Sequence, residues 1–529
     1  MAITIDTAFP GGGVEAVRFP DARTVEFAAP LDSGTQSLWF CFRVRGAKGR
    51  TLRFNQRGLE RVLGIHESRG YAPVCPVFRS GASDWARVDP RDISFTADPL
   101  SFSFVHRFDD DEAYFAFCYP YTNDDLAAYL AAHPSGLIRL EYPGKSDGGR
   151  DFPCLTVGHP EDPGVMNLVA VIARQHAGEV TGSFALEGML DALVADSSGG
   201  RGLLDNTLFV FFPLADIDCV EAGRYGKGQH PVDYNRDWSL APFHAGIRLM
   251  QGVIGELARR YRLRCVIDLH APQPGAPSYF VPNPQSPPGS EAWLDFWDFA
   301  QRFEDSCRGR HGFRIADVDP DVLDWGSLFN RSLNGSYFFH TYGAVALTVE
   351  LSYHRDHQGT LLTREDWRSL GGLLVGAYAA SSMNRTGSHP EVDPDRIPPW
   401  VVPERPGGWE HVTLPRGLQV RASRNGVVLS PRGLPNRAWL ACPLRSADGG
   451  GEAVRLSSDG DFGATVHRTY FKDACVLGIG KPEYRFFEKG EHVLSFAGRE
   501  LPAREYSVSL QLENLEAELR MSVDEAGEP

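Results

Sequence analysis

Hydrophobic and polar positions follow two different periods along the first 385 residues. Up to residue 118 the period is two, as where the odd and even positions of residues 38–44 alternate in character. Residues 101–105 and 114–118 show the same strand-like pattern, and turns rich in Gly and Asp separate such runs. A period of two is typical of strands in a sheet. We therefore predict an amino-terminal β-sandwich domain over residues 1–118.

Residues 119–385 combine almost wholly apolar runs with helical patterns. The apolar runs are 167–173, 207–212, 264–269 and 344–349. Helices are expected near 122–134, 183–196, 240–261, 291–306 and 364–382. Strands that are covered on both faces read as continuous apolar runs. Alternation of strands with helices favours an α/β domain. We expect a mostly parallel mixed sheet with helices on both faces.

The last part of the chain changes composition again. Residues 386–408 are rich in Pro and predict an extended linker. Residues 409–529 predict a small β-rich accessory domain, with Asn425-Gly426 as a hairpin turn. Metal-ligand spacing is not recognisable in this part, so the sequence leaves its role open.

Composition narrows the class of protein. The chain has 529 residues, 42% of them hydrophobic, and a formal net charge of −15 without a basic tract, which argues against nucleic-acid binding. The first residues lack the features of a signal peptide, and no apolar run approaches the length of a membrane span. Nine scattered Cys predict reduced thiols and a cytoplasmic location.

The candidate chemistry lies where apolar runs end. His176-Ala-Gly-Glu179 follows the run 167–173, and His270 follows the run 264–269. A His and a carboxylate three residues apart in one loop can both reach a metal ion, and His270 is the candidate for a third ligand. Three protein ligands leave a fourth position on Zn²⁺ for water. Ligands of open α/β sheets bind outside the carboxyl ends of the strands.

An ordered set of motifs resembles the zinc carboxypeptidase superfamily and, within it, the cytosolic carboxypeptidase branch. The segment around Tyr119-Pro-Tyr121 also resembles the junction between the two domains of that branch. The resemblance covers roughly residues 1–385. Its motifs are His176-x-x-Glu179, Asp233-Tyr-Asn235-Arg236, His270 and Thr348-Val-Glu350.

The resemblance implies a role for each motif. One zinc ion per chain would be held by His176, Glu179 and His270, with Glu350 as general base. Asn235 and Arg236 would bind the terminal carboxylate of a peptide, which a guanidinium fork matches well.

Some roles stay open among neighbouring residues. The family uses an Arg to stabilise the oxyanion, and here Arg224 is preferred over Lys227. Its substrate-binding Tyr corresponds to Tyr337 or Tyr342, with Tyr337 preferred.

Three further expectations concern the surroundings of the metal. Asp233 and backbone carbonyls near His270 are expected to orient the imidazoles. Ala177 replaces the Pro that is usual in the branch, which should loosen the loop. Arg331 and His340 are basic residues nearby in sequence that could read an acidic terminal side chain.

Three functions compete at this stage. The first is a zinc carboxypeptidase that hydrolyses the C-terminal peptide or isopeptide bond of a peptide or protein. The second is a zinc amidohydrolase that removes the acyl group of N-acyl amino acids on the same fold. The third is a non-catalytic peptide-binding protein, which would have no need of Glu350. The preferred terminal residue, the physiological substrate and the oligomeric state are not determined by the sequence.

Overall fold

In the computed structural model the chain forms two compact units. The described residues are 2–31, 36–62, 65, 72–162, 165–195, 200–227, 229, 233–238, 242–281, 291–311, 313 and 334–384, together with the strands between 418 and 523. The predicted linker 386–408 and Arg331 lie outside them. The first unit holds the amino-terminal strands and the α/β sheet; the second holds the carboxy-terminal strands and the segment around Tyr234.

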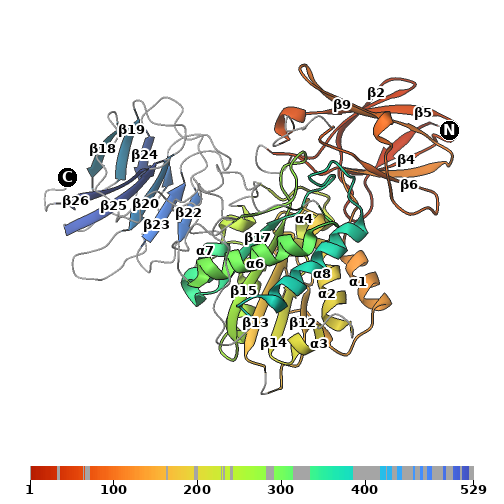
Figure 1. The fold of residues 1–529 in the computed structure, drawn as a ribbon. Coiled ribbons are helices and arrows are strands. Elements are labelled where there is room, and N and C mark those ends of the chain that lie inside the picture. The colour runs from red at the N-terminus through yellow and green to blue at the C-terminus, as the bar shows by residue number, and fades with distance from the viewer. Residues whose placement is uncertain are drawn as a thin grey trace. The chain divides into compact units, whose positions relative to one another are not determined.

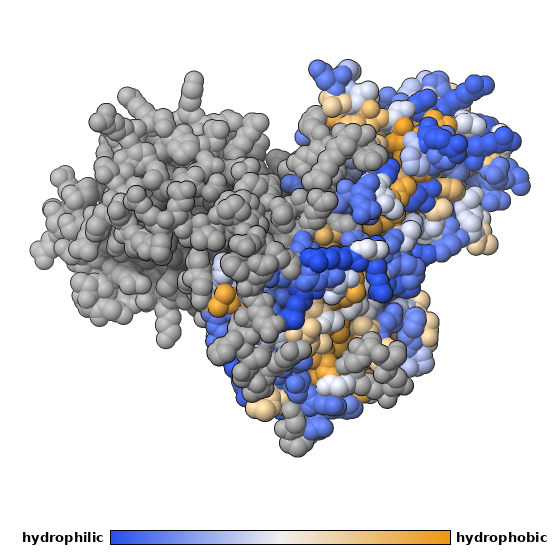
Figure 2. Space-filling model, viewed as in Figure 1, coloured by the Kyte–Doolittle hydropathy of each residue, from blue (hydrophilic) through white to orange (hydrophobic). Residues whose placement is uncertain are grey.

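The amino-terminal strands form two five-stranded sheets, as the alternating pattern predicts (Figure 1). Aromatic side chains from the two sheets meet between them: the ring centroids of Phe54 and Phe115 are 4.9 Å apart, and those of Phe42 and Phe54 are 5.7 Å apart. Hydrophilic residues dominate the outer rim of this sandwich in Figure 2. One sheet has the order β1 (Thr4–Asp6), β4 (Cys41–Arg45), β10 (Glu112–Ala116), β6 (Val77–Ser80), β7 (Ala86–Arg87). The other has the order β2 (Glu15–Asp21), β3 (Thr24–Ala28), β5 (Thr51–Arg57), β9 (Leu100–Arg107), β8 (Ile93–Ala97).

The α/β part is built on a seven-stranded mixed sheet. All four strands that the apolar runs predict lie together in its centre and run parallel. The sheet is mixed, as expected, because the three other neighbouring pairs are antiparallel. The antiparallel strands are short and lie toward the edges, so their sequences carry little periodicity. The order is β11 (Ile138–Glu141), β12 (Cys154–Val157), β14 (Thr207–Phe212), β13 (Asn167–Ala173), β15 (Arg262–His270), β17 (Val345–Glu350), β16 (Tyr279–Val281).

Helices α2, α6 and α8 pack together over the central strands (Figure 1). Close packing of α2 on α8 requires glycine: a Cβ added at Gly188 would lie 1.9 Å from the carbonyl oxygen of Arg368. The predicted helices are α1 (Asn123–Ala132), α2 (Thr181–Val194), α5 (Ala245–Leu257), α6 (Glu291–Cys307) and α8 (Arg364–Ala380). Shorter ones that the sequence did not predict are α3 (Gly200–Leu204), α4 (Ile217–Glu221), α7 (Asn334–Tyr342) and the 3₁₀ turns η1 (Leu59–Arg61), η2 (Pro90–Asp92) and η3 (Tyr234–Arg236).

Helix ends follow the capping chemistry of the sequence. Thr122 caps α1 and Thr363 caps α8, each in a capping box with an Asp three residues later. Among the described residues, no helix combines the length and the apolar character that crossing a membrane requires.

The carboxy-terminal strands form a four-stranded and a five-stranded sheet. β18 and β19 are antiparallel neighbours with Ser423 opposite Gly426, so Gly426 lies in a strand and not in the turn that was predicted. The first sheet is β18 (Leu418–Ser423), β19 (Gly426–Pro431), β24 (His492–Ser495), β21 (Ser457–Ser458). The second is β22 (Thr465–Arg468), β23 (Ala474–Gly478), β20 (Ala438–Pro443), β25 (Arg504–Leu512), β26 (Leu515–Val523).

Candidate metal centre

The register of three neighbouring parallel strands brings the candidate residues to one edge of the sheet. β13 pairs with β15, and β15 pairs with β17. His270 and Glu350 are the last residues of their strands and lie opposite each other in the register. The loop that carries His176 leaves the adjacent strand β13 at the same edge, because parallel strands share their carboxyl ends.

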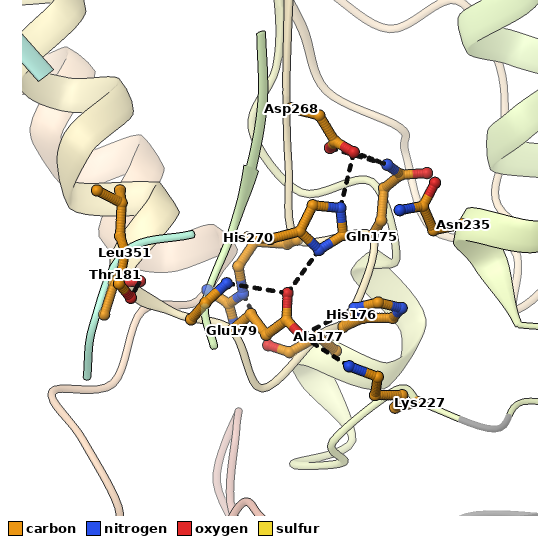
Figure 3. Close-up of polar contacts among 12 residues, drawn as sticks. Gln175, His176, Ala177, Glu179, Thr181, Lys227, Asn235, Asp268, His270 and Leu351 are labelled. Carbon is orange, nitrogen blue, oxygen red and sulfur yellow. Dashed lines mark hydrogen bonds and ion pairs between the residues drawn. The ribbon is translucent and has the colours of Figure 1, made fainter. Parts of the chain in front are cut away.

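Two imidazoles converge on one carboxylate at this edge (Figure 3). Nδ1 of His176 lies 2.8 Å from Oε1 of Glu179, and Nδ1 of His270 lies 2.7 Å from Oε2. One ligand atom from each of the three residues lies within 4.8 Å of the others. All three side chains are buried. The structure thus brings together the three residues that the sequence proposed as metal ligands.

The loop that carries the first two ligands is held rigidly despite Ala177. Arg174 adopts a left-handed backbone conformation, with φ of 66°, where β13 ends. Its buried guanidinium donates hydrogen bonds to the carbonyl oxygens of Ala177 (2.7 Å) and Tyr121 (3.1 Å). The expected loosening at Ala177 is therefore offset by Arg174, a contribution that the sequence did not suggest.

The segment Tyr225-Gly226 packs against this loop. The backbone N–H of Gly178 donates a hydrogen bond of 2.7 Å to the carbonyl oxygen of Tyr225. Gly226 has φ of +74°, and a Cβ added there would lie 2.6 Å from the backbone nitrogen of Ala177. Glycine is needed at this position because of both its conformation and its close approach.

The electrostatics of the cluster suit a cation. Burial opposes ionisation of Glu179, but the imidazoles of His176 and His270 and the ammonium of Lys227 outweigh it and hold the pKa of Glu179 well below its usual range. Conversely, burial disfavours a charged His270, but Asp268 and Glu179 raise its pKa well above the usual value. The cluster offers two imidazole nitrogens and one carboxylate, and zinc commonly binds this set of ligands. The residues therefore fit a zinc ion.

A second carboxylate orients the ring of His270. Oδ2 of Asp268 lies 2.7 Å from Nε2 of His270, which leaves Nδ1 directed at Glu179. Gln175 in turn donates from Nε2 to both oxygens of Asp268, at 2.8 and 2.9 Å. Asp233, one of the expected candidates for this role, accepts a hydrogen bond from the backbone N–H of Asn235 and caps η3. Spacing could have revealed Asp268, because residues two apart in a strand point to the same face.

Removing the charge of Asp268 should weaken metal binding without removing a ligand. Asp268→Asn is expected to lower zinc affinity by about 10- to 100-fold, the usual effect of losing a residue that orients a metal-bound imidazole. Competition with a chelator of known affinity measures this. The matched control is Asp298→Asn, since this buried carboxylate hydrogen-bonds Ser382 and Arg302 instead. Equal zinc affinity in both variants and the unmodified protein would contradict the role of Asp268.

The two candidates for the oxyanion-binding residue differ in placement. Nη1 of Arg224 lies 3.3 Å from both the carboxylate of Glu15 and the carbonyl oxygen of Leu31, in the amino-terminal sandwich. Nζ of Lys227 lies 3.6 Å from Oε1 of Glu179. Lys227 is therefore the one of the two candidates that lies beside the proposed metal ligands.

The candidates for substrate binding lie in the second unit. Asn235 and Arg236 form part of η3, where Nη1 of Arg236 lies 3.2 Å from the carbonyl oxygen of Asn235. Tyr337 is buried in α7, and its ring centroid is 5.5 Å from that of Trp238. The side chain of His340, like the whole of Arg331, lies outside what the structure describes.

A mixed sheet with a His-Glu-His cluster at the carboxyl ends of its parallel strands defines a metallopeptidase-like α/β protein of the zinc carboxypeptidase class. Residues 124–256 match the family model "Zinc carboxypeptidase". Residues 5–118 match "Cytosolic carboxypeptidase N-terminal domain". These matches assign residues 124–256 to the zinc carboxypeptidase family and residues 5–118 to the amino-terminal domain of its cytosolic branch. His270 and Glu350 lie beyond both matched ranges and are supported by the geometry above.

Known relatives agree with this assignment. Cytosolic carboxypeptidase 6 of Mus musculus is 27% identical over 290 residues, which are 51% of this chain and 53% of the relative. An uncharacterized protein of Zymomonas mobilis is 24% identical over 383 residues, 69% of this chain and 92% of that protein. The match thus spans about half the length of the mouse relative.

A solved structure shows the same fold. The metallo-carboxypeptidase from Burkholderia cenocepacia superposes with a TM-score of 0.61 at 21% identity. The superposition covers 71% of this chain and 98% of that one.

Proposed function

We propose that this protein is a zinc-dependent carboxypeptidase that hydrolyses the C-terminal peptide or isopeptide bond of a peptide or protein. The observation that supports this most directly is the pairing of His270 with Glu350 across β15 and β17, beside His176 and Glu179. Metal ligands alone would suit a structural site. A carboxylate at the same strand end, which is not one of the three ligands, adds the base that hydrolysis needs.

Glu350 has the protonation behaviour that a general base needs. Desolvation, together with the nearby charge of Glu179, raises the pKa of Glu350 to about 7, although the imidazole of His270 opposes this. A carboxylate with such a pKa can take a proton from water and return it to the departing amine near neutral pH. Zinc, when bound, lowers the pKa of its water and polarises a substrate carbonyl.

Lys227 is proposed as the residue that stabilises the oxyanion. Attack on an amide carbonyl places negative charge on its oxygen, and a cation held next to the metal ligands can stabilise that charge. Lys227 meets this condition through its 3.6 Å approach to Glu179. A Lys contributes a compact point charge where the family has a planar Arg, so this position is a departure from the family pattern.

Asn235 and Arg236 are proposed to bind the terminal carboxylate of the substrate, with Tyr337 also contacting it. The support is the Asp-x-Asn-Arg motif and the guanidinium chemistry of Arg236. A cytoplasmic location is proposed as well, on the strength of the amino-terminal domain match.

Cleavage should be confined to free chain ends. A peptide with a free C-terminal carboxylate is expected to be cleaved, and its C-terminally amidated twin is not. Losing a charge-assisted contact costs about 1.5–3 kcal/mol, more if Arg236 is left unpaired. This corresponds to roughly 10- to 150-fold in kcat/KM. Arg236→Ala should remove most of this preference, whereas Arg259→Ala, which alters an arginine paired with Glu256, should keep it.

The same assay separates the alternatives. N-acyl amino acids are tested beside a set of peptides that differ in their terminal residue. Faster hydrolysis of the acyl amino acids would assign the protein to the amidohydrolase alternative. Equal cleavage of the free-acid and amidated peptides by the unmodified enzyme would contradict the carboxypeptidase proposal.

A further inference from the structure

The four residues that follow Glu350 are held by their backbone carbonyls. This segment, residues 351–354, continues the chain from Glu350 at the end of β17 toward the turn before α8. Each carbonyl has a donor from a different part of the first unit. The donors are Oγ1 of Thr181 to Leu351 (3.0 Å), Nε1 of Trp367 to Ser352 (3.0 Å), Nη2 of Arg87 to Tyr353 (2.7 Å) and the backbone N–H of Leu362 to His354 (2.9 Å).

Arg87 comes from the amino-terminal sandwich, and the carbonyl oxygen of Tyr353 that it holds also accepts a longer contact, 3.5 Å, from Sγ of Cys118 in the same domain. Arg87 is the last residue of β7, far from residues 351–354 in sequence. Its Nη2 also donates to the carbonyl oxygen of Leu362 at 2.9 Å, so one nitrogen bridges both ends of the turn. Nη1 donates to the carbonyl oxygen of Cys75 at 2.8 Å, which ties the guanidinium to its own domain.

The remaining contacts of Arg87 are specific to a planar guanidinium. Nη1 lies 2.8 Å from Nδ1 of His354. Burial, Arg87 and Arg355 hold the pKa of His354 well below its usual value, so the ring is neutral and Nδ1 can accept this hydrogen bond. The guanidinium also lies over the ring of Tyr119, 4.9 Å from its centroid. A lysine could supply the charge but not this fork of donors.

We propose that Arg87 is a positioning residue for Glu350: through this guanidinium the amino-terminal sandwich holds residues 351–354 and thereby keeps the carboxylate of Glu350 in its working position. This inference rests on the proposed function, since it assigns the sandwich a part in the same reaction. Small displacements of a reacting group, of about 1 Å, can cost roughly 100-fold in rate.

The test compares Arg87→Ala and Arg87→Lys with Arg364→Ala. Arg364 is a matched control, because it pairs with Asp84 across the same domain boundary and also lies over Tyr119, but it is not a donor to residues 351–354. Steady-state kinetics on a free-acid peptide should show kcat lowered by about 10- to 100-fold in Arg87→Ala and by a smaller factor in Arg87→Lys, with KM and zinc content nearly unchanged. Arg364→Ala should keep kcat. Unchanged kcat in both Arg87 variants would overturn the proposal.

A double-mutant cycle separates positioning from a general loss of structure. If Arg87 acts through Glu350, adding Arg87→Ala to Glu350→Gln should cause little further loss, because the group that it positions is already absent. A full additional 10- to 100-fold loss in the double variant would indicate a structural role alone and would overturn the proposal.

Hydrogen exchange provides a readout that needs no turnover. In Arg87→Lys, amides of residues 351–362 should exchange faster than in the unmodified protein, while those of β13 and β15 keep their protection. Unchanged exchange in this segment overturns the proposal. If the unmodified enzyme hydrolyses no peptide, the carboxypeptidase proposal fails, and the exchange result still decides whether Arg87 holds the segment.

Discussion

Glu350→Gln is expected to bind zinc and peptide as the unmodified protein does, yet to lose turnover by roughly 10²- to 10⁴-fold or more, the range for removing a general base. The amide keeps the size and hydrogen-bonding capacity of the carboxylate but cannot accept a proton. Because Glu350 is not one of the three ligands, its replacement leaves the metal site intact. Steady-state kinetics, zinc analysis and peptide binding on the same preparation test this separation.

The pH dependence of the unmodified enzyme provides an independent check on Glu350. With its pKa raised to about 7, the base is protonated at lower pH, so activity should rise with pH through the neutral range.

The control for Glu350→Gln is Glu365→Gln, since this exposed carboxylate in the first turn of α8 pairs with Arg368. Undiminished turnover in Glu350→Gln would show that another group acts as the base.

Loss of either histidine ligand should remove the metal altogether. The purified protein is expected to hold about one zinc ion per chain, and His176→Ala and His270→Ala should each release it and abolish hydrolysis. Each imidazole contributes one of the nitrogen atoms that converge on Glu179. Without either of them, two protein ligands remain, which are too few to hold zinc. Elemental analysis after dialysis measures the outcome.

The control for the histidine variants is His311→Ala. Nε2 of His311 lies 2.9 Å from the hydroxyl of Ser369, so its removal should leave zinc in place. Metal binding in the unmodified protein should weaken as the pH falls, because protons compete for the imidazoles and the carboxylate. Retention of full zinc by both His176→Ala and His270→Ala would refute the assigned ligands.

The periodicity of the sequence determined the main elements of the fold. The strands that hold the metal residues are continuous apolar runs, since both faces of each are covered, and the expected bounds of β13 and β14 agree with the structure to within a residue. The period of two in the amino-terminal strands likewise predicts a sandwich, and the rings of Phe54 and Phe115 meet in its core. Short strands such as β16 were missed because three residues show no period.

The ligand residues could also be found from the sequence, because each stands where an apolar run ends and the order of the motifs is distinctive. The orienting residues are harder to find. The spacing of Asp268 and His270 places both on one face of a strand, but Asp268 carries no motif of its own, and its importance follows from the 2.7 Å contact with His270. Arg174 matters through a left-handed backbone conformation, which no propensity of arginine predicts.

Contacts between distant segments were decided by the tertiary structure alone. Arg224 and Lys227 are three residues apart, and the sequence-based preference for Arg224 rested on no feature of their surroundings. Packing directs Arg224 to the amino-terminal sandwich and Lys227 to Glu179. Arg87 reaches a segment more than 260 residues away. Local sequence determines which residues can end a strand or supply a charge. The partner that each charge meets depends on how the domains pack, because such contacts join residues whose separation in sequence carries no signal.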